Sequence, residues 1–133
     1  MADLWMQFLL TLDATLRVAT PLILCAMAGL FSERSGIIDI SLEGKMLMAA
    51  FAAGTLAALT GSAIAGLAGA ILVSVMFSLI HGFACITHKG NQVISGLAIN
   101  ILASGLTVTL GIAIFAKGGQ TPMLSREARF SSI

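Results

Sequence analysis

Charged residues gather in one short stretch of an otherwise apolar chain, between residues 31 and 51. They are Glu33, Arg34, Asp39, Glu43 and Lys45. A carboxylate removed from water needs a partner of opposite charge, and Arg34 and Lys45 are the basic residues nearest in sequence to Asp39 and Glu43. The stretch is either an ordinary loop with its charges in water or a partly buried, non-helical approach to a membrane helix. The second arrangement would present polar backbone to a transport pathway.

Two glycines, Gly36 and Gly44, enclose the centre of this stretch, whose sequence is GIIDISLEG. Glycine adopts backbone conformations that other residues avoid, so both positions suit turns. Apolar residues stand between Asp39, Ser41 and Glu43, and the segment runs directly into the next apolar region. Asp39 and Glu43 are therefore the carboxylates that we expect to be partly buried.

Two asparagines mark the last apolar region of the chain. Asn91 precedes it and can cap a helix that starts there. Asn100 lies inside the apolar run, where its amide must find a partner in a helix bundle or in a water-lined path. Two hypotheses remain open for Asn100: a hydrogen bond that only holds helices together, or a residue that lines a pathway.

Catalytic and metal-binding patterns are weak in this sequence. His81, Cys85 and His88 are spaced so that they could share a helix face, but three ligands do not complete a tetrahedral site, and we expect no metal. No nucleophile–base set stands out, and no glycine-rich loop with Gly-Lys-Ser/Thr could bind the phosphates of ATP. We therefore expect neither an enzyme nor a cofactor, and no ATP hydrolysis by this chain itself.

The composition indicates which elements must position these residues. Of the 133 residues 58% are hydrophobic and 10% are charged, whereas a soluble domain carries about 25% charged residues. A membrane-spanning helix needs roughly 20 apolar residues. We expect an all-α polytopic transmembrane bundle with four spans, at about residues 14–31, 44–60, 63–86 and 93–116. Residues 1–13 are expected to lie at the membrane interface, and residues 117–133 to form an extramembrane tail.

Small residues recur every four positions along the third expected span and predict close helix packing. They are Ser62, Gly66, Ala70, Ser74, Ser78 and Gly82. Such a stripe lets a second helix approach closely, so the spans belong in a bundle. The basic residues divide almost evenly between the two sides, so the positive-inside rule does not decide the orientation.

The sequence from residue 19 to 53 resembles the N-terminal region of inner-membrane permease subunits of bacterial ABC importers. The similarity is to the simple-sugar and nucleoside group, related to the ribose and branched-chain amino-acid permeases. In that group a proline-containing helix runs into a segment that matches residues 36–44 here, although Asp39 and Ser41 replace the usual Asn and Gly. The sequence NQVISGLAINILASGLT, at residues 91–107, also resembles the start of a later helix of the family, including its internal Asn100.

This resemblance implies a role and a set of partners. Such a permease pairs with a second permease subunit, two cytoplasmic ABC ATPase subunits and an extracytoplasmic substrate-binding lipoprotein in the bacterial inner membrane. It implies that the loop between the third and fourth spans is cytoplasmic. It also implies that residues 36–44 form a re-entrant or broken approach to the second span. Members of the family have more membrane helices than the four expected here, so we expect residues 1–133 to be the N-terminal part of a single permease domain.

Function is therefore expected to be transport of a nucleoside or a simple sugar, and the sequence does not decide between them. The main alternative is a small non-transporting four-helix membrane protein that acts as a scaffold or assembly factor. A third possibility is a small self-contained secondary transporter or channel. For Asp39 and Glu43 we favour a structural role over contact with substrate.

Overall fold

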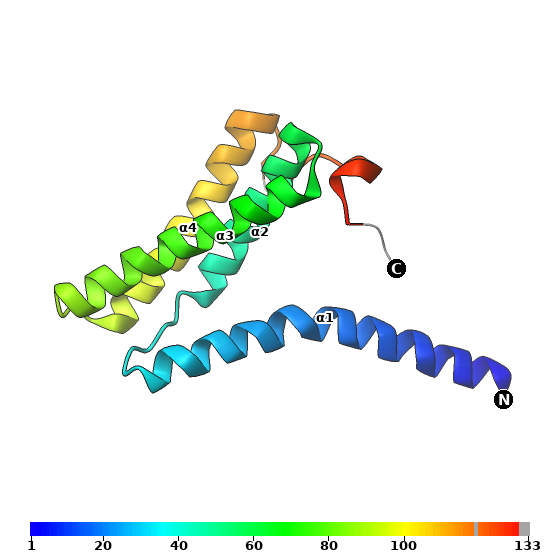
Figure 1. Ribbon diagram of the computed structural model, residues 1–133, viewed down its shortest axis with the longest axis horizontal. Coiled ribbons are helices and arrows are strands. Elements are labelled where there is room, and N and C mark those ends of the chain that lie inside the picture. The colour runs from blue at the N-terminus through cyan, green and yellow to red at the C-terminus, as the bar shows by residue number, and fades with distance from the viewer. Residues whose placement is uncertain (119, 131–133) are drawn as a thin grey trace. The chain divides into compact units, whose positions relative to one another are not determined.

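The computed structural model describes residues 1–118 and 120–130 as helices joined by short connections (Figure 1). The long helices are α1 (Ala2–Arg34), α2 (Leu42–Thr60), α3 (Ala63–Gly82) and α4 (Gln92–Phe115). A π-helical turn, η1 (Phe83–Thr87), extends α3, and a short 3-10 helix, η2 (Arg126–Ala128), follows α4. The described residues contain no strand, so the expected all-α class is confirmed. The chain divides into two compact units, Met1–Ile38 and Asp39–Ile133, which are considered separately.

Among the described residues, four helical segments are long and apolar enough to cross a membrane. They are Asp3–Arg34, Leu42–Thr60, Ala63–Thr87 and Gln92–Phe115. The second and fourth contain 19 and 24 residues. At about 1.5 Å per residue, helices of this length match or slightly exceed a hydrocarbon core of about 30 Å. The prediction of a polytopic helical membrane protein is confirmed.

The first helix begins earlier than expected. We expected an interfacial segment at residues 1–13 and a span from residue 14, whereas α1 runs unbroken from Ala2. No glycine or proline interrupts residues 2–20, and the hydroxyls of Thr11 and Thr15 donate to carbonyls one turn earlier instead of capping a new helix. The 33 residues of α1 extend about 50 Å, more than the hydrocarbon core. An interfacial location for residues 1–13 stays a prediction.

Gly36 ends α1 in a Schellman motif. Its N–H donates to the carbonyl of Glu33 at 3.0 Å, and the N–H of Ile37 donates to the carbonyl of Ser32 at 3.2 Å. Gly36 has φ = +87°, a left-handed conformation that disfavours any residue with a Cβ. The turn predicted at Gly36 is therefore present. It satisfies the carbonyls of Ser32 and Glu33 at the end of α1.

In the second unit α2 packs against both α3 and α4 (Figure 1). Their shared core consists of Met48 from α2, Phe77 from α3, and Ile99 and Ala103 from α4. Many other long apolar side chains point outward, and Ile101 on α4 is 72% exposed. A helix bundle with an apolar outer surface and a small core suits a lipid environment, where outward apolar side chains carry no cost.

The six small residues of α3 and its N-cap have different surroundings. Gly66 is buried, and a Cβ at this position would lie 2.7 Å from the carbonyl oxygen of Ala53 and 3.0 Å from Cβ of Ala57, both on α2. Ser62, Ala70, Ser74 and Gly82 are partly buried, and Ser78 is exposed. The first part of the stripe therefore contacts α2. Packing of its remaining residues against further helices stays a prediction.

Alanine substitutions at Gly66 and Gly82 are expected to change stability in opposite directions. Gly66→Ala would force α2 and α3 apart and should cost about 1–3 kcal/mol, as overpacking typically does. A Cβ at Gly82 meets nothing within 4 Å, so Gly82→Ala should gain about 0.5–1 kcal/mol from helix propensity. Unfolding of the purified protein in detergent measures both changes. An equal loss at the two positions would show that other helices cover the whole stripe.

Candidate functional site

Polar side chains gather where the connection between α1 and α2 meets α3 and α4. We call Asp39, Ser41, Lys45, His81 and Ser95 the Asp39 cluster. Asp39 and Ser41 belong to the irregular connection, Lys45 to the first turn of α2, His81 to the end of α3 and Ser95 to the start of α4. Ser41, Lys45 and His81 are fully or almost fully buried. Four segments of the chain therefore meet at one buried polar point.

The Asp39 carboxylate accepts hydrogen bonds at both oxygens. Oδ1 accepts from the N–H of Ser41 at 3.0 Å and from the Ser41 hydroxyl, and Oδ2 accepts from Lys45 Nζ. The side chains of Lys45 and Asp39 are only 6% and 10% exposed. Burial alone would raise the pKa of Asp39, but the hydrogen bonds from Lys45 and Ser41 and the charge of Lys45 outweigh it and lower the pKa. The carboxylate is therefore ionised at neutral pH.

His81 connects this carboxylate to α4. Its Nε2 lies 3.8 Å from Asp39 Oδ1, and its Nδ1 lies 3.0 Å from Ser95 Oγ, with donor and acceptor set by the tautomer. Cys85 Sγ lies 3.7 Å from the same Nε2. His88, the third residue of the weak metal pattern, is exposed and packs edge-on against a neighbouring aromatic ring. Of the three residues in this pattern, His81 belongs to the Asp39 cluster, Cys85 lies beside it, and His88 lies elsewhere.

Asn100, on α4, caps the N-terminus of α2. Its Oδ1 accepts from the N–H of Gly44 at 2.8 Å, and its Nδ2 donates to the carbonyl of Ile40 at 3.1 Å. Gly44 is the third residue of α2, so its N–H has no partner within the helix. Ser41 occupies the N-cap position but makes no side-chain cap, and its hydroxyl donates to Asp39. The Asn100 amide, which belongs to α4, therefore supplies the hydrogen-bond acceptor that an N-cap side chain of α2 would normally provide.

Two glycines let the backbones approach closely at this point. A Cβ on Gly44 would lie 2.7 Å from Asn100 Oδ1 and 2.9 Å from Asn100 Cα. A Cβ on Gly96 would lie 3.1 Å from Cβ of Ile40 and 3.2 Å from the backbone nitrogen of Ser41. Both contacts join α4 to the segment 40–44, so a larger residue at either position would push the two apart.

The remaining candidate residues lie outside this cluster. Glu43 is exposed, unlike Asp39, because the first turn of α2 directs it away from the buried polar groups. Arg34 is exposed at the end of α1. Asn91 caps its own helix, since its Oδ1 accepts from the N–H groups of Val93 and Ile94 at 3.0 and 3.2 Å. The expected burial thus applies to one of the two carboxylates.

The centre of the cluster is a buried ion pair between Asp39 and Lys45. Each oxygen of Asp39 already accepts from a protein donor, and Ser41 is 0% exposed, so the ion pair has little capacity left for a ligand. Sequence reasoning identified Asp39, Ser41 and Asn100 but not the participation of Ser95, and it considered His81 only as a metal ligand. No pattern within the sequence linked His81 to Asp39, 42 positions earlier, or Ser95 to His81, 14 positions earlier.

The chain is similar to known transport permeases. The family described as branched-chain amino acid transport system / permease component matches residues 11–131. The guanosine ABC transporter permease NupQ of Bacillus subtilis is 41% identical over 110 residues, which are 78% of this chain and 34% of that protein. The nucleoside ABC transporter permease NupC of Lactococcus lactis is 36% identical over 109 residues, 77% of this chain and 34% of the relative.

A third relative carries a different substrate name. TsgC13 of Haloferax volcanii, provisionally named a glucose ABC transporter permease, is 38% identical over 100 residues, 75% of this chain and 30% of its own length. The chain thus spans about a third of the length of these relatives. No solved structure matches it. With nearly all of its residues matched by one family and four helices able to cross a membrane, the chain belongs to the permease family of the branched-chain amino acid transport system.

Proposed function

We propose that this chain forms part of the membrane-spanning permease of an ATP-driven importer whose substrate is a nucleoside. The observation that carries the proposal is the similarity over three quarters of the chain to permeases named for guanosine and for nucleosides. The buried Asp39 cluster and the Asn100 cap support it. They hold a non-helical segment against the bundle, as transporters do where irregular backbone borders a pathway. Family membership disfavours the alternative of a non-transporting scaffold.

The proposed transporter is an assembly of this permease with several other subunits. A second permease subunit would complete the pathway, two ABC ATPase subunits would bind and hydrolyse ATP, and an extracytoplasmic lipoprotein would deliver the substrate. The location would be the bacterial inner membrane. In this arrangement the chain performs no covalent chemistry, and its helices alternate between two packings that open the pathway to either side.

Uptake by the assembled transporter tests this function. Proteoliposomes with the permease, its ATPases and its binding lipoprotein are expected to import radiolabelled guanosine only when ATP is supplied. Glucose and leucine, each offered alone, serve as the comparison substrates. Import of glucose without guanosine would move the assignment to simple sugars, and no ATP-dependent import of any of the three would contradict it.

A further inference from the structure

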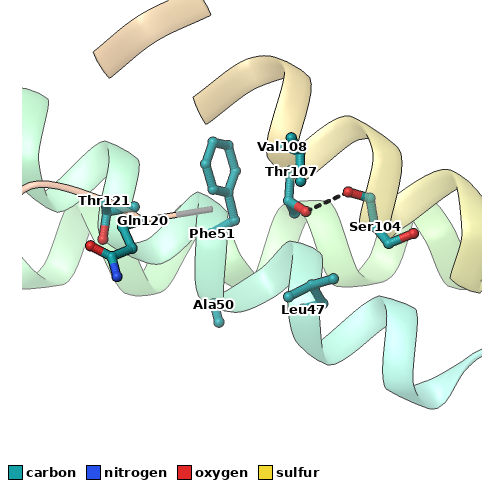
Figure 2. A pocket seen from close by; sticks show the side chains of 8 residues that line it. All are labelled: Leu47, Ala50, Phe51, Ser104, Thr107, Val108, Gln120 and Thr121. Atoms are coloured by element: carbon teal, nitrogen blue, oxygen red, sulfur yellow. Dashed lines mark hydrogen bonds between the residues drawn. The ribbon is translucent and has the colours of Figure 1, made fainter. Parts of the chain in front are cut away.

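A second polar feature lies apart from the Asp39 cluster, in a cavity between α2, α4 and the segment after α4. The cavity has a volume of about 420 Å³. Figure 2 shows the ring of Phe51 in the space between α2 and α4, with Gln120 and Thr121 on one side and Thr107 on the other. This volume falls within the range of about 300–1,000 Å³ found for small-molecule sites.

Hydroxyl groups on α4 give the cavity hydrogen-bond acceptors. Thr107 Oγ1 donates to the carbonyl of Ser104 at 3.0 Å, and Ser104 Oγ donates to the carbonyl of Ile101 at 2.9 Å (Figure 2 draws the first of these bonds). Each hydroxyl proton is thereby used within the helix, while each oxygen retains lone pairs. The two oxygens are therefore suited to accept hydrogen bonds from a ligand that carries hydroxyl groups.

The opposite wall adds an amide and an aromatic face. Gln120 brings a primary amide, which both donates and accepts. Thr121 packs over Gly54 of α2, where a Cβ would lie 3.1 Å from its side chain, so this part of the segment after α4 sits close to α2. The partly buried ring of Phe51 offers a flat surface on which a planar heterocycle can stack.

The absence of charged side chains among the described residues that line the cavity favours a neutral ligand. Every side chain that lines it is uncharged. A zwitterionic amino acid or a nucleotide would bring charged groups with no partner of opposite sign, at a high desolvation cost. A nucleoside is neutral, and it combines a planar base with sugar hydroxyls.

We propose that this cavity is a substrate-contacting subsite of the permease, in which Phe51 stacks on the base of a nucleoside and the oxygens of Ser104 and Thr107 accept from its ribose hydroxyls. The inference rests on the proposed nucleoside function and assigns residues to it. It places substrate contact on the middle of α2 and α4, away from Asp39, whose oxygens already have partners.

Thiol protection in the assembled transporter tests the subsite. Ser104→Cys, in a background without other reactive thiols, should react with a small neutral methanethiosulfonate, and guanosine should slow that reaction in a saturable way. Ala113→Cys is the matched control, because Ala113 is exposed on the same helix and does not line the cavity. Guanosine should leave its labelling rate unchanged, and ribose alone should protect neither cysteine.

Second substitutions in the Ser104→Cys background separate recognition from a general change of structure. Phe51→Ala should raise the guanosine concentration for half-protection about tenfold, whereas Phe51→Tyr should keep it near the original value. Thr107→Val should raise it about two- to tenfold. Thr109→Val is its control: Thr109 is exposed and makes the same kind of bond to a carbonyl of its own helix, and this change should have no effect.

Two outcomes would overturn the subsite, and a third would remove the stacking role of Phe51, while guanosine transport stays intact. The first is that Ser104→Cys fails to react, which would mean that other helices of the permease cover it. The second is that it reacts at a rate that guanosine does not alter. The third is that guanosine protects Ser104→Cys equally well with and without Phe51→Ala, which would show that Phe51 does not stack on the base. Loss of guanosine uptake in the unsubstituted transporter is a distinct result, because it contradicts the proposed function itself.

Discussion

Replacing Lys45 with methionine is expected to lower the free energy of unfolding by about 3–5 kcal/mol, the usual cost of breaking a buried ion pair. The pair is closed to solvent, since the two side chains are 6% and 10% exposed. Methionine fills a similar volume, so the main loss is the charge that compensates Asp39. The remaining carboxylate would be left with the hydrogen bonds from Ser41 and the more distant His81.

A double-mutant cycle isolates this charge effect. Asp39→Asn alone leaves Lys45 buried without its counterion and should cost a similar amount. The pair Asp39→Asn with Lys45→Met removes both charges, and it should cost much less than the sum of the single changes because exchanging a buried pair for neutral groups is often tolerated. Unfolding midpoints of the purified permease in detergent measure all three variants.

An exposed ion pair on α1 provides the matched control. Arg17 and Asp13 lie one turn apart with 3.5 Å between their charged atoms, and their side chains are 79% and 70% exposed. Arg17→Met should change stability by no more than about 1 kcal/mol, as is typical of exposed pairs. Equal losses for Arg17→Met and Lys45→Met, or strict additivity in the cycle, would contradict a special role for the buried pair.

Helix content follows from local features of this sequence, and the buried site does not. The length of the apolar runs was sufficient to predict four membrane helices, because a helix that crosses lipid must be apolar over about 20 residues. The continuity of α1 from Ala2 was not predicted, because hydropathy locates the part that suits lipid, whereas a helix continues until some residue breaks it. Asp3, Gln7 and Asp13 lower the hydropathy of residues 1–13 without breaking the helix.

The turn at Gly36 and the charge partner of Asp39 were also predictable, since they depend on neighbours. The turn expected at Gly44 is wrong, because Gly44 is the third residue of α2. Gly36 has the left-handed conformation that its position suggested, and Lys45, the nearest following base, does pair with Asp39. Glu43 differs because it lies in the first turn of α2 and its side chain is exposed, away from the Asp39 cluster. A one-dimensional pattern of charges does not reveal which face of a helical turn is covered.

The Asn100 contact lies beyond any local pattern, because it joins a side chain to backbone groups 56 and 60 positions earlier. The sequence did indicate that an amide inside an apolar run needs a partner. It could not indicate that the partners are the N–H of Gly44 and the carbonyl of Ile40. The structure also shows that Ser41 is the N-cap residue of α2 and that its hydroxyl donates to Asp39.

Replacing Asn100 with leucine is accordingly expected to cost about 1–3 kcal/mol, because the buried N–H of Gly44 then has no acceptor. Leucine has nearly the same shape, so the expected loss comes from the two missing hydrogen bonds that hold α4 to the start of α2 and not from a steric clash. Asn100→Asp keeps an acceptor for Gly44 but loses the donor to Ile40, and it should cost less than leucine. Unfolding of the purified protein in detergent gives the values.

Asn91 supplies the comparison within the same helix. It caps α4 locally and is exposed, so Asn91→Ala should cost about 1 kcal/mol and should leave the contact between α2 and α4 intact. Cysteine pairs placed across that contact would separate the two cases. The yield of a crosslink between Leu47→Cys and Ser104→Cys, which line one cavity between the helices, should fall in Asn100→Leu and stay unchanged in Asn91→Ala.

Gly44→Ala tests the same junction from the other helix. The added Cβ would lie 2.7 Å from Asn100 Oδ1 and 2.9 Å from its Cα, so α2 must move away from α4 and the hydrogen bond must lengthen. Because both substitutions break one contact, Gly44→Ala combined with Asn100→Leu should cost less than the sum of the two separate losses. Additive losses would mean that Gly44 and Asn100 act independently, and the cap supplied by α4 would then not be what fixes the start of α2.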